Sequence, residues 1–344
     1  MENSIKASGN HQPVHVVALA LRDAAGRVLV QQRPDHKHQG GLWEFPGGKV
    51  EPGESPLAAL RREIHEELDY TLGAAGPLIQ VTHDYPDKSV RLEVWQAVDP
   101  QAAARLRPAE GQPIRWVGVD ALRRLPMPAA DRPVVNALRL PDHYWITPFL
   151  PADGVSAHRA SSQAIQSWLR TARSRLDSGV RMVQFRSKTI PETNRALLLK
   201  ALYPWCREKG VALIYNGEVG VGRAMLDYGI ADGLHLSSAQ LMALRQRPVD
   251  DIHWLSASVH NEEELHQARK LEVDFVSLSP VRATQSHPQA QPLGWERFAE
   301  LARQAHCPVY ALGGMALADV SAARAAGGQG VAGITLPARP KLSP

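Results

Sequence analysis

The chain has 344 residues, 44% of them hydrophobic and 22% charged, so it is long enough for two globular domains and is not typical of a disordered protein. A net charge of +4 is small for this length, and the basic residues are scattered, which argues against stable binding of nucleic acid. No apolar stretch is long enough to predict a membrane-spanning helix.

The expected location is a reducing cytoplasm. Cys206 and Cys307 are the two cysteines, and their spacing predicts neither a disulfide framework nor a zinc site. The polar N-terminal residues 1–13 lack the apolar core of a signal peptide.

The first part of the chain, residues 1–140, predicts a mixed α/β domain. Residues 14–23 and 27–33 are β-rich runs around a glycine-containing turn, which is typical of a hairpin. A glycine-rich loop at residues 38–54 precedes a helix. Further strands are expected at residues 77–86, 89–98 and 114–122, and a helix at residues 132–140.

The remainder, residues 141–344, alternates short apolar runs with amphipathic segments such as 161–179 and 261–272. Strands are expected at residues 143–148, 180–187, 212–217, 233–238, 253–259, 275–281, 308–314 and 330–335. Eight strands that are mostly followed by helices predict a (β/α)8 barrel.

The helix after the glycine-rich loop carries a dense group of carboxylates. Ser55 suits the N-cap and Pro56 the first helical position, so the helix should begin there. At 100° per residue, Leu60, Ile64 and Leu68 form an apolar stripe. The face next to this stripe carries Glu63, Glu66 and Glu67.

Two interpretations of these glutamates compete. Like charges three and four residues apart destabilise a helix by roughly 0.2–0.5 kcal/mol per pair. The glutamates therefore form either a solvated acidic face or a site for a divalent ion, which favours oxygen ligands.

The surrounding spacing resembles the Nudix box, the signature of the Nudix hydrolase family. The matching residues are Gly48, Glu54, Arg62, Glu63, Ile64, Glu66 and Glu67. Asp69 stands where the family usually has glycine. Because Asp tolerates the left-handed conformation that a helix end requires, we expect the geometry to be retained.

Within that family, residues 14–140 are most similar to the MutT type, which hydrolyses oxidised guanine nucleotides. The resemblance implies divalent-ion ligands, Mg²⁺ or Mn²⁺, at Gly48 (through its carbonyl), Glu63, Glu66, Glu67 and Glu110. Arg62 would orient the cluster, and Glu54 would support it or assist proton transfer. The nucleotide would be lined by Arg33, Phe45 and Lys88.

Asp131 stands where the MutT type has an asparagine that reads the base. An ionised carboxylate can accept a hydrogen bond from the N7–H of an oxidised guanine but faces the O6 lone pairs unfavourably, unless it is protonated in a dry pocket. Asp131 is equally suited to cap the helix that begins at Pro133.

The second domain resembles the thiamine phosphate synthase and thiazole tautomerase family from residue 143 to about residue 337. Gly313 and Gly314 would form a backbone phosphate site, or serve only as tight turns. Gly217 and Gln240 stand where synthases carry metal-binding carboxylates, and Pro280 replaces the catalytic histidine of the tautomerases. Both chemistries are therefore in doubt.

These resemblances predict an α/β/α Nudix sandwich followed by a barrel of the TIM type. The expected activity is metal-dependent cleavage of a nucleoside triphosphate, foremost 8-oxo-dGTP, to the monophosphate and pyrophosphate, which protects DNA replication from damaged precursors. Alternatives are hydrolysis of a thiamine-pathway diphosphate, or a Nudix enzyme whose barrel is inactive and senses a phosphorylated, thiamine-related ligand.

Overall fold

The computed structural model describes residues 13–36, 39–150, 162–186, 192–284 and 289–336. The chain divides into two compact units, Met1–Arg139 and Leu140–Pro344. Each unit is described by itself.

The N-terminal unit is built on a mixed seven-stranded sheet. Its strands are β1 (Val14–Arg22), β2 (Val28–Gln32), β3 (Trp43–Glu44), β4 (Gly47–Lys49), β5 (Gly76–Asp84), β6 (Ser89–Val98) and β7 (Ile114–Val117). The path runs β3-β2-β1-β6-β5, with β4 paired to β1 and β7 to β2. The β1–β6 pair is parallel and the others are antiparallel. The predicted hairpin and strands are confirmed.

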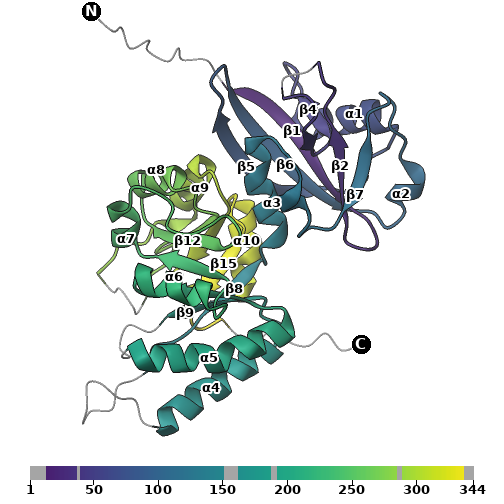
Figure 1. The fold of residues 1–344 in the computed structure, drawn as a ribbon. Coiled ribbons are helices and arrows are strands. Elements are labelled where there is room, and N and C mark those ends of the chain that lie inside the picture. The colour runs from purple at the N-terminus through teal and green to yellow at the C-terminus, as the bar shows by residue number, and fades with distance from the viewer. Residues whose placement is uncertain (1–12, 37–38, 151–161, 187–191, 285–288, 337–344) are drawn as a thin grey trace, which may run out of the picture. The chain divides into compact units, whose positions relative to one another are not determined.

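Helices cover both faces of this sheet. The helices are α1 (Pro56–Leu68), α2 (Ala102–Arg105) and α3 (Arg132–Arg139). Successive residues of β1 point to opposite faces, so Leu19 packs with α1 and Ala18 with α3. The α/β/α sandwich expected from the sequence is thereby confirmed (Figure 1).

The glycine-rich stretch is not purely a loop, because it contains β3 and β4. Gly47 makes β4 possible: its φ is +148°, and a Cβ there would lie 2.1 Å from the Val17 carbonyl oxygen. Alternation of apolar residues cannot show this strand, since glycines that pack against a neighbouring backbone carry no hydrophobic signal.

The C-terminal unit is a closed barrel of eight parallel strands, as predicted (Figure 1). The strands are β8 (His143–Ile146), β9 (Met182–Arg186), β10 (Ala212–Asn216), β11 (Gly233–Leu236), β12 (Trp254–Val259), β13 (Phe275–Leu278), β14 (Val309–Leu312) and β15 (Gly330–Gly333). Outside them lie α4 (Ser162–Asp177), α5 (Glu192–Lys209), α6 (Val219–Asp227), α7 (Ser238–Ala243), α8 (Glu262–Lys270), α9 (Gly294–Gln304) and α10 (Val320–Ala325).

Large aromatic side chains fill the inside of the barrel. Tyr144, Phe275 and Tyr310 pack edge to face around its axis, with ring centroids 4.8–6.0 Å apart. Cys206 and Cys307 are buried free thiols in the layer between strands and helices. In the described part of the chain, every helix is too short or too polar to cross a membrane.

Candidate functional site

The carboxylate helix α1 begins and ends as the sequence predicts. The Ser55 hydroxyl accepts a hydrogen bond from the Ala58 N–H at 3.3 Å, and Pro56 is the first helical residue. Asp69 ends the helix in the left-handed conformation, with φ 45° and ψ 40°, so it fills the position usually held by glycine. The stripe that faces the sheet is fully buried.

Arg62 lies at the centre of the acidic group. Its Nη1 donates to Glu63 at 2.9 Å and to Glu66 at 3.2 Å, while Nε and Nη2 hold both oxygens of Glu54 at 3.2 and 3.0 Å. Nη2 also donates to the Lys49 carbonyl oxygen at 3.1 Å. Hydrogen bonds to Glu54 and Glu63 raise the pKa of Arg62, and those from Arg62 lower the pKa of Glu54.

Glu67 lies apart from this group, on the side of the helix that faces the sheet. Its Oε2 accepts a hydrogen bond from the Gly47 N–H at 2.9 Å, and only 8% of the residue is exposed. Burial raises the pKa of Glu67 to about 8, against hydrogen bonds from Gln31 and Gly47 that lower it. The carboxyl group is therefore largely protonated at neutral pH when no cation is bound.

The donors fit a divalent ion in chemistry, and Gly48, Glu63 and Glu66 lie close together. Gly48 lies directly against Glu63, because a Cβ at this position would come 2.3 Å from a Glu63 carboxylate oxygen. One nitrogen of Arg62 touches both Glu63 and Glu66, so it occupies the place between them that a cation would take. Within the described residues, no three acidic, His or Cys side chains already converge as ligands. Binding an ion therefore requires these side chains to turn away from Arg62.

Glu110 belongs to an exposed loop that is tied to the C-terminal end of α1. The Arg107 N–H donates to the Leu68 carbonyl oxygen at 2.7 Å, and the Ala109 N–H to that of Glu67 at 2.8 Å. The structure thus brings the Glu110 backbone close to α1.

Asp131 and its neighbours form a buried polar group on the other face of the sheet. Asp131 is 5% exposed, and burial, reinforced by the Glu44 carboxylate and opposed by Arg33, holds its pKa well above the usual range. Arg33 forms an ion pair with Glu44, and the Tyr85 hydroxyl accepts a long hydrogen bond, 3.4 Å, from the Ala130 N–H.

Asp131 makes no capping hydrogen bond. It ends a 3₁₀ turn, Ala129–Asp131, that leads directly into α3, and no side-chain hydrogen bond of Asp131 is found in the described part of the chain. A neutral carboxyl group can both donate and accept, so its chemistry matches that of an asparagine amide.

The other two predicted nucleotide-lining residues lie nearby in the fold. Phe45 is buried in the same hydrophobic cluster as Ala130, against which Tyr85 packs. Lys88 lies in the turn between β5 and β6, where its carbonyl oxygen accepts the Tyr85 N–H at 2.8 Å.

In the barrel, Gly313 and Gly314 follow β14 with φ of 98° and 67°. A Cβ on Gly313 would lie 2.9 Å from Pro280, and one on Gly314 would lie 2.9 Å from the Ala283 carbonyl oxygen. Both positions therefore require glycine for the backbone alone, and phosphate binding there stays a prediction.

The positions that lack the family carboxylates have structural partners. Gln240 accepts hydrogen bonds from the N–H and hydroxyl of Ser237 and donates to the Gly217 carbonyl oxygen at 2.7 Å. A Cβ on Gly217 would lie 2.3 Å from the Tyr215 hydroxyl. Glu218, the nearest carboxylate in sequence, caps α6 through the N–H groups of its first turn.

Several buried polar residues were not expected from the sequence. His235 lies between the hydroxyls of Ser256 and Ser258, at 2.8 and 2.9 Å, and burial lowers its pKa to about 3, so it is neutral. In the N-terminal unit, Gln31 and Gln112 lie next to Glu67. Side chains of a barrel strand alternate between its two faces, and this alternation was the signal in the sequence that could have placed His235 on a buried face. The family motif at residues 182–188 ends outside the described residues.

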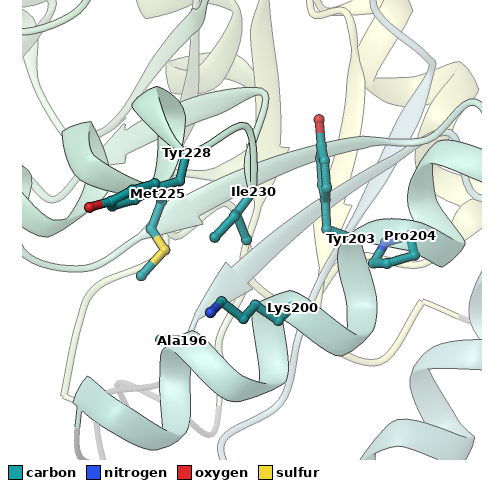
Figure 2. Close-up of a pocket in the computed structure, with 7 residues that line it drawn as sticks. All are labelled: Ala196, Lys200, Tyr203, Pro204, Met225, Tyr228 and Ile230. Atoms are coloured by element: carbon teal, nitrogen blue, oxygen red, sulfur yellow. The ribbon is translucent and has the colours of Figure 1, made fainter.

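The structure also contains a cavity of about 560 Å³ on the outer wall of the barrel, between α5 and α6. Figure 2 shows Lys200 and Tyr203 of α5 across from Met225 and Ile230. None of the predicted site residues lines this cavity.

Known proteins resemble the two units separately. The NUDIX domain family matches residues 17–137, and the family described as thiamine monophosphate synthase matches residues 156–336. The chain is 42% identical over 82 residues to the 8-oxo-dGTP diphosphatase of Proteus vulgaris, which covers 24% of the chain and 73% of that protein. It is 34% identical over 124 residues to the CTP pyrophosphohydrolase of Escherichia coli, a match that covers 36% of the chain and 90% of that protein. It is 31% identical over 171 residues to the putative thiamine-phosphate synthase 2 of Aquifex aeolicus, a match that covers 50% of the chain and 90% of that protein.

Proposed function

Because the chain belongs to the Nudix family through its N-terminal unit and to the thiamine monophosphate synthase family through its C-terminal unit, we propose a Nudix hydrolase that cleaves a nucleoside triphosphate to the monophosphate and pyrophosphate. The preferred substrate is 8-oxo-dGTP and the ion is Mg²⁺, with Mn²⁺ as a substitute. The arrangement of Glu54, Glu63 and Glu66 around Arg62, with Glu67 on the neighbouring face, carries this proposal.

Each residue of the proposed site has its own expected role in hydrolysis. A bound divalent ion supplies charge neutralisation for the phosphates and activation of water. Glu63, Glu66, Glu67, Glu110 and the Gly48 carbonyl would hold it. Arg62 keeps Glu54 ionised and fixed through two hydrogen bonds, so that Glu54 can support the cluster or take up a proton. Arg33 and Lys88 supply positive charge beside the nucleotide.

The raised pKa of Asp131 favours its protonated form, which is suited to recognition of an oxidised purine. Its carbonyl oxygen would accept the N7–H that oxidation creates, and its O–H would donate to O6. The similarity to a CTP pyrophosphohydrolase makes CTP the main competing substrate. Pyrophosphate release measured against 8-oxo-dGTP, dGTP, CTP and a thiamine-pathway diphosphate tests the proposal, and equal rates on all four would contradict it.

Asp131→Asn should retain discrimination between 8-oxo-dGTP and dGTP at neutral pH. In Asp131→Ala the preference for 8-oxo-dGTP over dGTP should fall about 10- to 100-fold. The raised pKa of Asp131 adds a pH test. As pH rises through that pKa the carboxyl group loses its proton, and with it the donor to O6. KM for 8-oxo-dGTP should therefore increase as pH rises through that pKa in the native protein but not in Asp131→Asn. Identical pH profiles, or stronger discrimination by Asp131→Asn at neutral pH, would show that the native carboxylate is ionised.

Residues 1–142 should suffice for hydrolysis, because every proposed catalytic residue lies in the N-terminal unit. The measurement is kcat of the fragment against that of the full chain, which should agree within a few-fold. A fragment that is folded by circular dichroism but inactive would show that the barrel completes the site.

A second function is favoured for the barrel, which we propose binds a phosphorylated, thiamine-related ligand. Gly313 and Gly314 lie at the carboxyl end of β14, where barrels of this type often bind phosphate through backbone N–H groups. Calorimetric titration with a thiazole phosphate tests this, and absence of binding would contradict it.

A further inference from the structure

Two buried glutamines, Gln31 and Gln112, meet beside Glu67. Gln31 is 3% exposed on β2, and Gln112 is 7% exposed just before β7. The antiparallel pairing of these strands, which places Gln31 opposite Ile114, brings the two amides together. Gln31 caps no helix, whereas Gln112 donates to a carbonyl oxygen in the last turn of α1.

The pair contacts both the main chain and the side chain of Glu67. The Nε2 of Gln112 donates to the Glu67 carbonyl oxygen at 2.8 Å and to Oε1 of Gln31 at 3.3 Å. The side-chain amide of Gln31 hydrogen-bonds in turn to the Glu67 carboxyl group. Since the Gly47 N–H also donates to that carboxyl group, at 2.9 Å, Glu67 is held from both β2 and β4.

The same contacts hold the loop that carries Glu110. The Glu67 carbonyl oxygen accepts both the Ala109 N–H and the Gln112 amide, each at 2.8 Å. Gln112 therefore closes a ring of hydrogen bonds from the end of α1 through residues 109–112. Glu67 and Glu110, two proposed ligands on different elements, are thereby tied to each other.

A packing role alone does not account for Gln112. Its Oε1 is buried and has no hydrogen-bond partner within the part of the chain that the structure describes. A buried acceptor without a partner destabilises a fold, and methionine would fill the same space without it. In spite of this cost the chain has a glutamine at this position, and the NH₂ group of its amide donates to the Glu67 carbonyl oxygen.

We propose that Gln31 and Gln112 are positioning residues for divalent-ion binding, which fix Glu67 and the Glu110 loop relative to each other. The inference rests on the proposed function, since it takes these carboxylates as ligands. Groups that orient metal ligands typically change metal affinity by about 10- to 100-fold when removed. Phe45 and Ala130, the neighbour of Asp131, pack on the face of the sheet opposite α1, so nucleotide binding should be unaffected.

The test uses the full chain with Gln112→Met and Gln31→Met, which keep side-chain length, and Gln96→Met on β6 as the control. Mn²⁺ binding without nucleotide is measured by electron paramagnetic resonance. We expect each of the first two variants to bind Mn²⁺ about 10- to 100-fold more weakly, and the double variant to be no weaker than the worse single variant. KM for nucleotide at saturating ion should be unchanged, and Gln96→Met should behave as the native protein.

Unchanged Mn²⁺ affinity with a lower melting temperature would overturn the inference and leave only a structural role for the amides. If Gln112→Met does not fold, Gln31→Met alone decides between these outcomes. Failure of the proposed function looks different, because the native chain itself would then bind no Mn²⁺ or hydrolyse no nucleotide.

Discussion

Glu67→Gln should lower kcat for nucleotide hydrolysis by roughly 10²–10⁴-fold at saturating Mg²⁺. The amide keeps the shape of the side chain and its contact with the Gly47 N–H, but it cannot supply the negative charge that an ion requires. The rate is measured as pyrophosphate release from the best nucleotide of the panel. Near-normal kcat would exclude Glu67 as a ligand.

The same substitution should stabilise the metal-free protein. The pKa of Glu67 is about 8 in the folded chain against an ordinary value of 4.5, so the stability contributed by the protonated form is lost as pH rises through this window. Glutamine does not titrate. The variant should therefore gain ~2–4 kcal/mol over the native protein between pH 5 and pH 9, measured by urea unfolding in a chelator.

Glu51→Gln is the matched control, because Glu51 is an exposed residue of the stretch before α1 and lies outside the carboxylate cluster. It should change neither kcat nor the pH dependence of unfolding. A gain in stability for Glu67→Gln that is independent of pH would contradict the assigned protonation state.

We also expect that the full chain forms no detectable thiamine phosphate. That reaction displaces pyrophosphate from a pyrimidine diphosphate, and the leaving group needs a metal ion to take up its charge. Gln240 is neutral and hydrogen-bonds to Ser237 and Gly217, and Glu218 accepts hydrogen bonds from the first turn of α6. Product is measured chromatographically, alongside the calorimetric titration of the barrel.

Restoring one carboxylate should not restore the reaction. Gly217→Asp places a Cβ 2.3 Å from the buried Tyr215 hydroxyl, so it should lower the melting temperature and create no metal site. Gln240→Asp breaks the capping box of α7 and the link to Gly217. Thiamine phosphate formation by the native chain would show that Glu218 leaves its capping position to bind an ion.

The elements that local sequence determines were predictable. Ser55, Pro56 and Asp69 specify where α1 begins and ends through backbone chemistry within a few residues, and the structure confirms all three. The eight barrel strands were equally visible, because parallel strands buried on both faces are continuous apolar runs. The acidic face of α1 could be located by arithmetic on the helix period.

The environment of each carboxylate could not be predicted in this way. Glu66 and Glu67 are adjacent in sequence, yet one is exposed beside Arg62 and the other is buried beside Gly47. That difference depends on where β4 passes relative to α1. The burial of Asp131 and the meeting of Gln31 with Gln112 likewise depend on strands far apart in the chain, for which residue spacing carries no information.

The Arg62 guanidinium donates to both Glu63 and Glu66, so helix α1 itself supplies a counter-ion for its carboxylates. The proposed divalent ion would therefore meet Glu63 and Glu66 already neutralised in part by Arg62, and its binding would have to break those two hydrogen bonds. Because the guanidinium is attached to the same helix, it would remain close enough to pair with the carboxylates again once the ion had left.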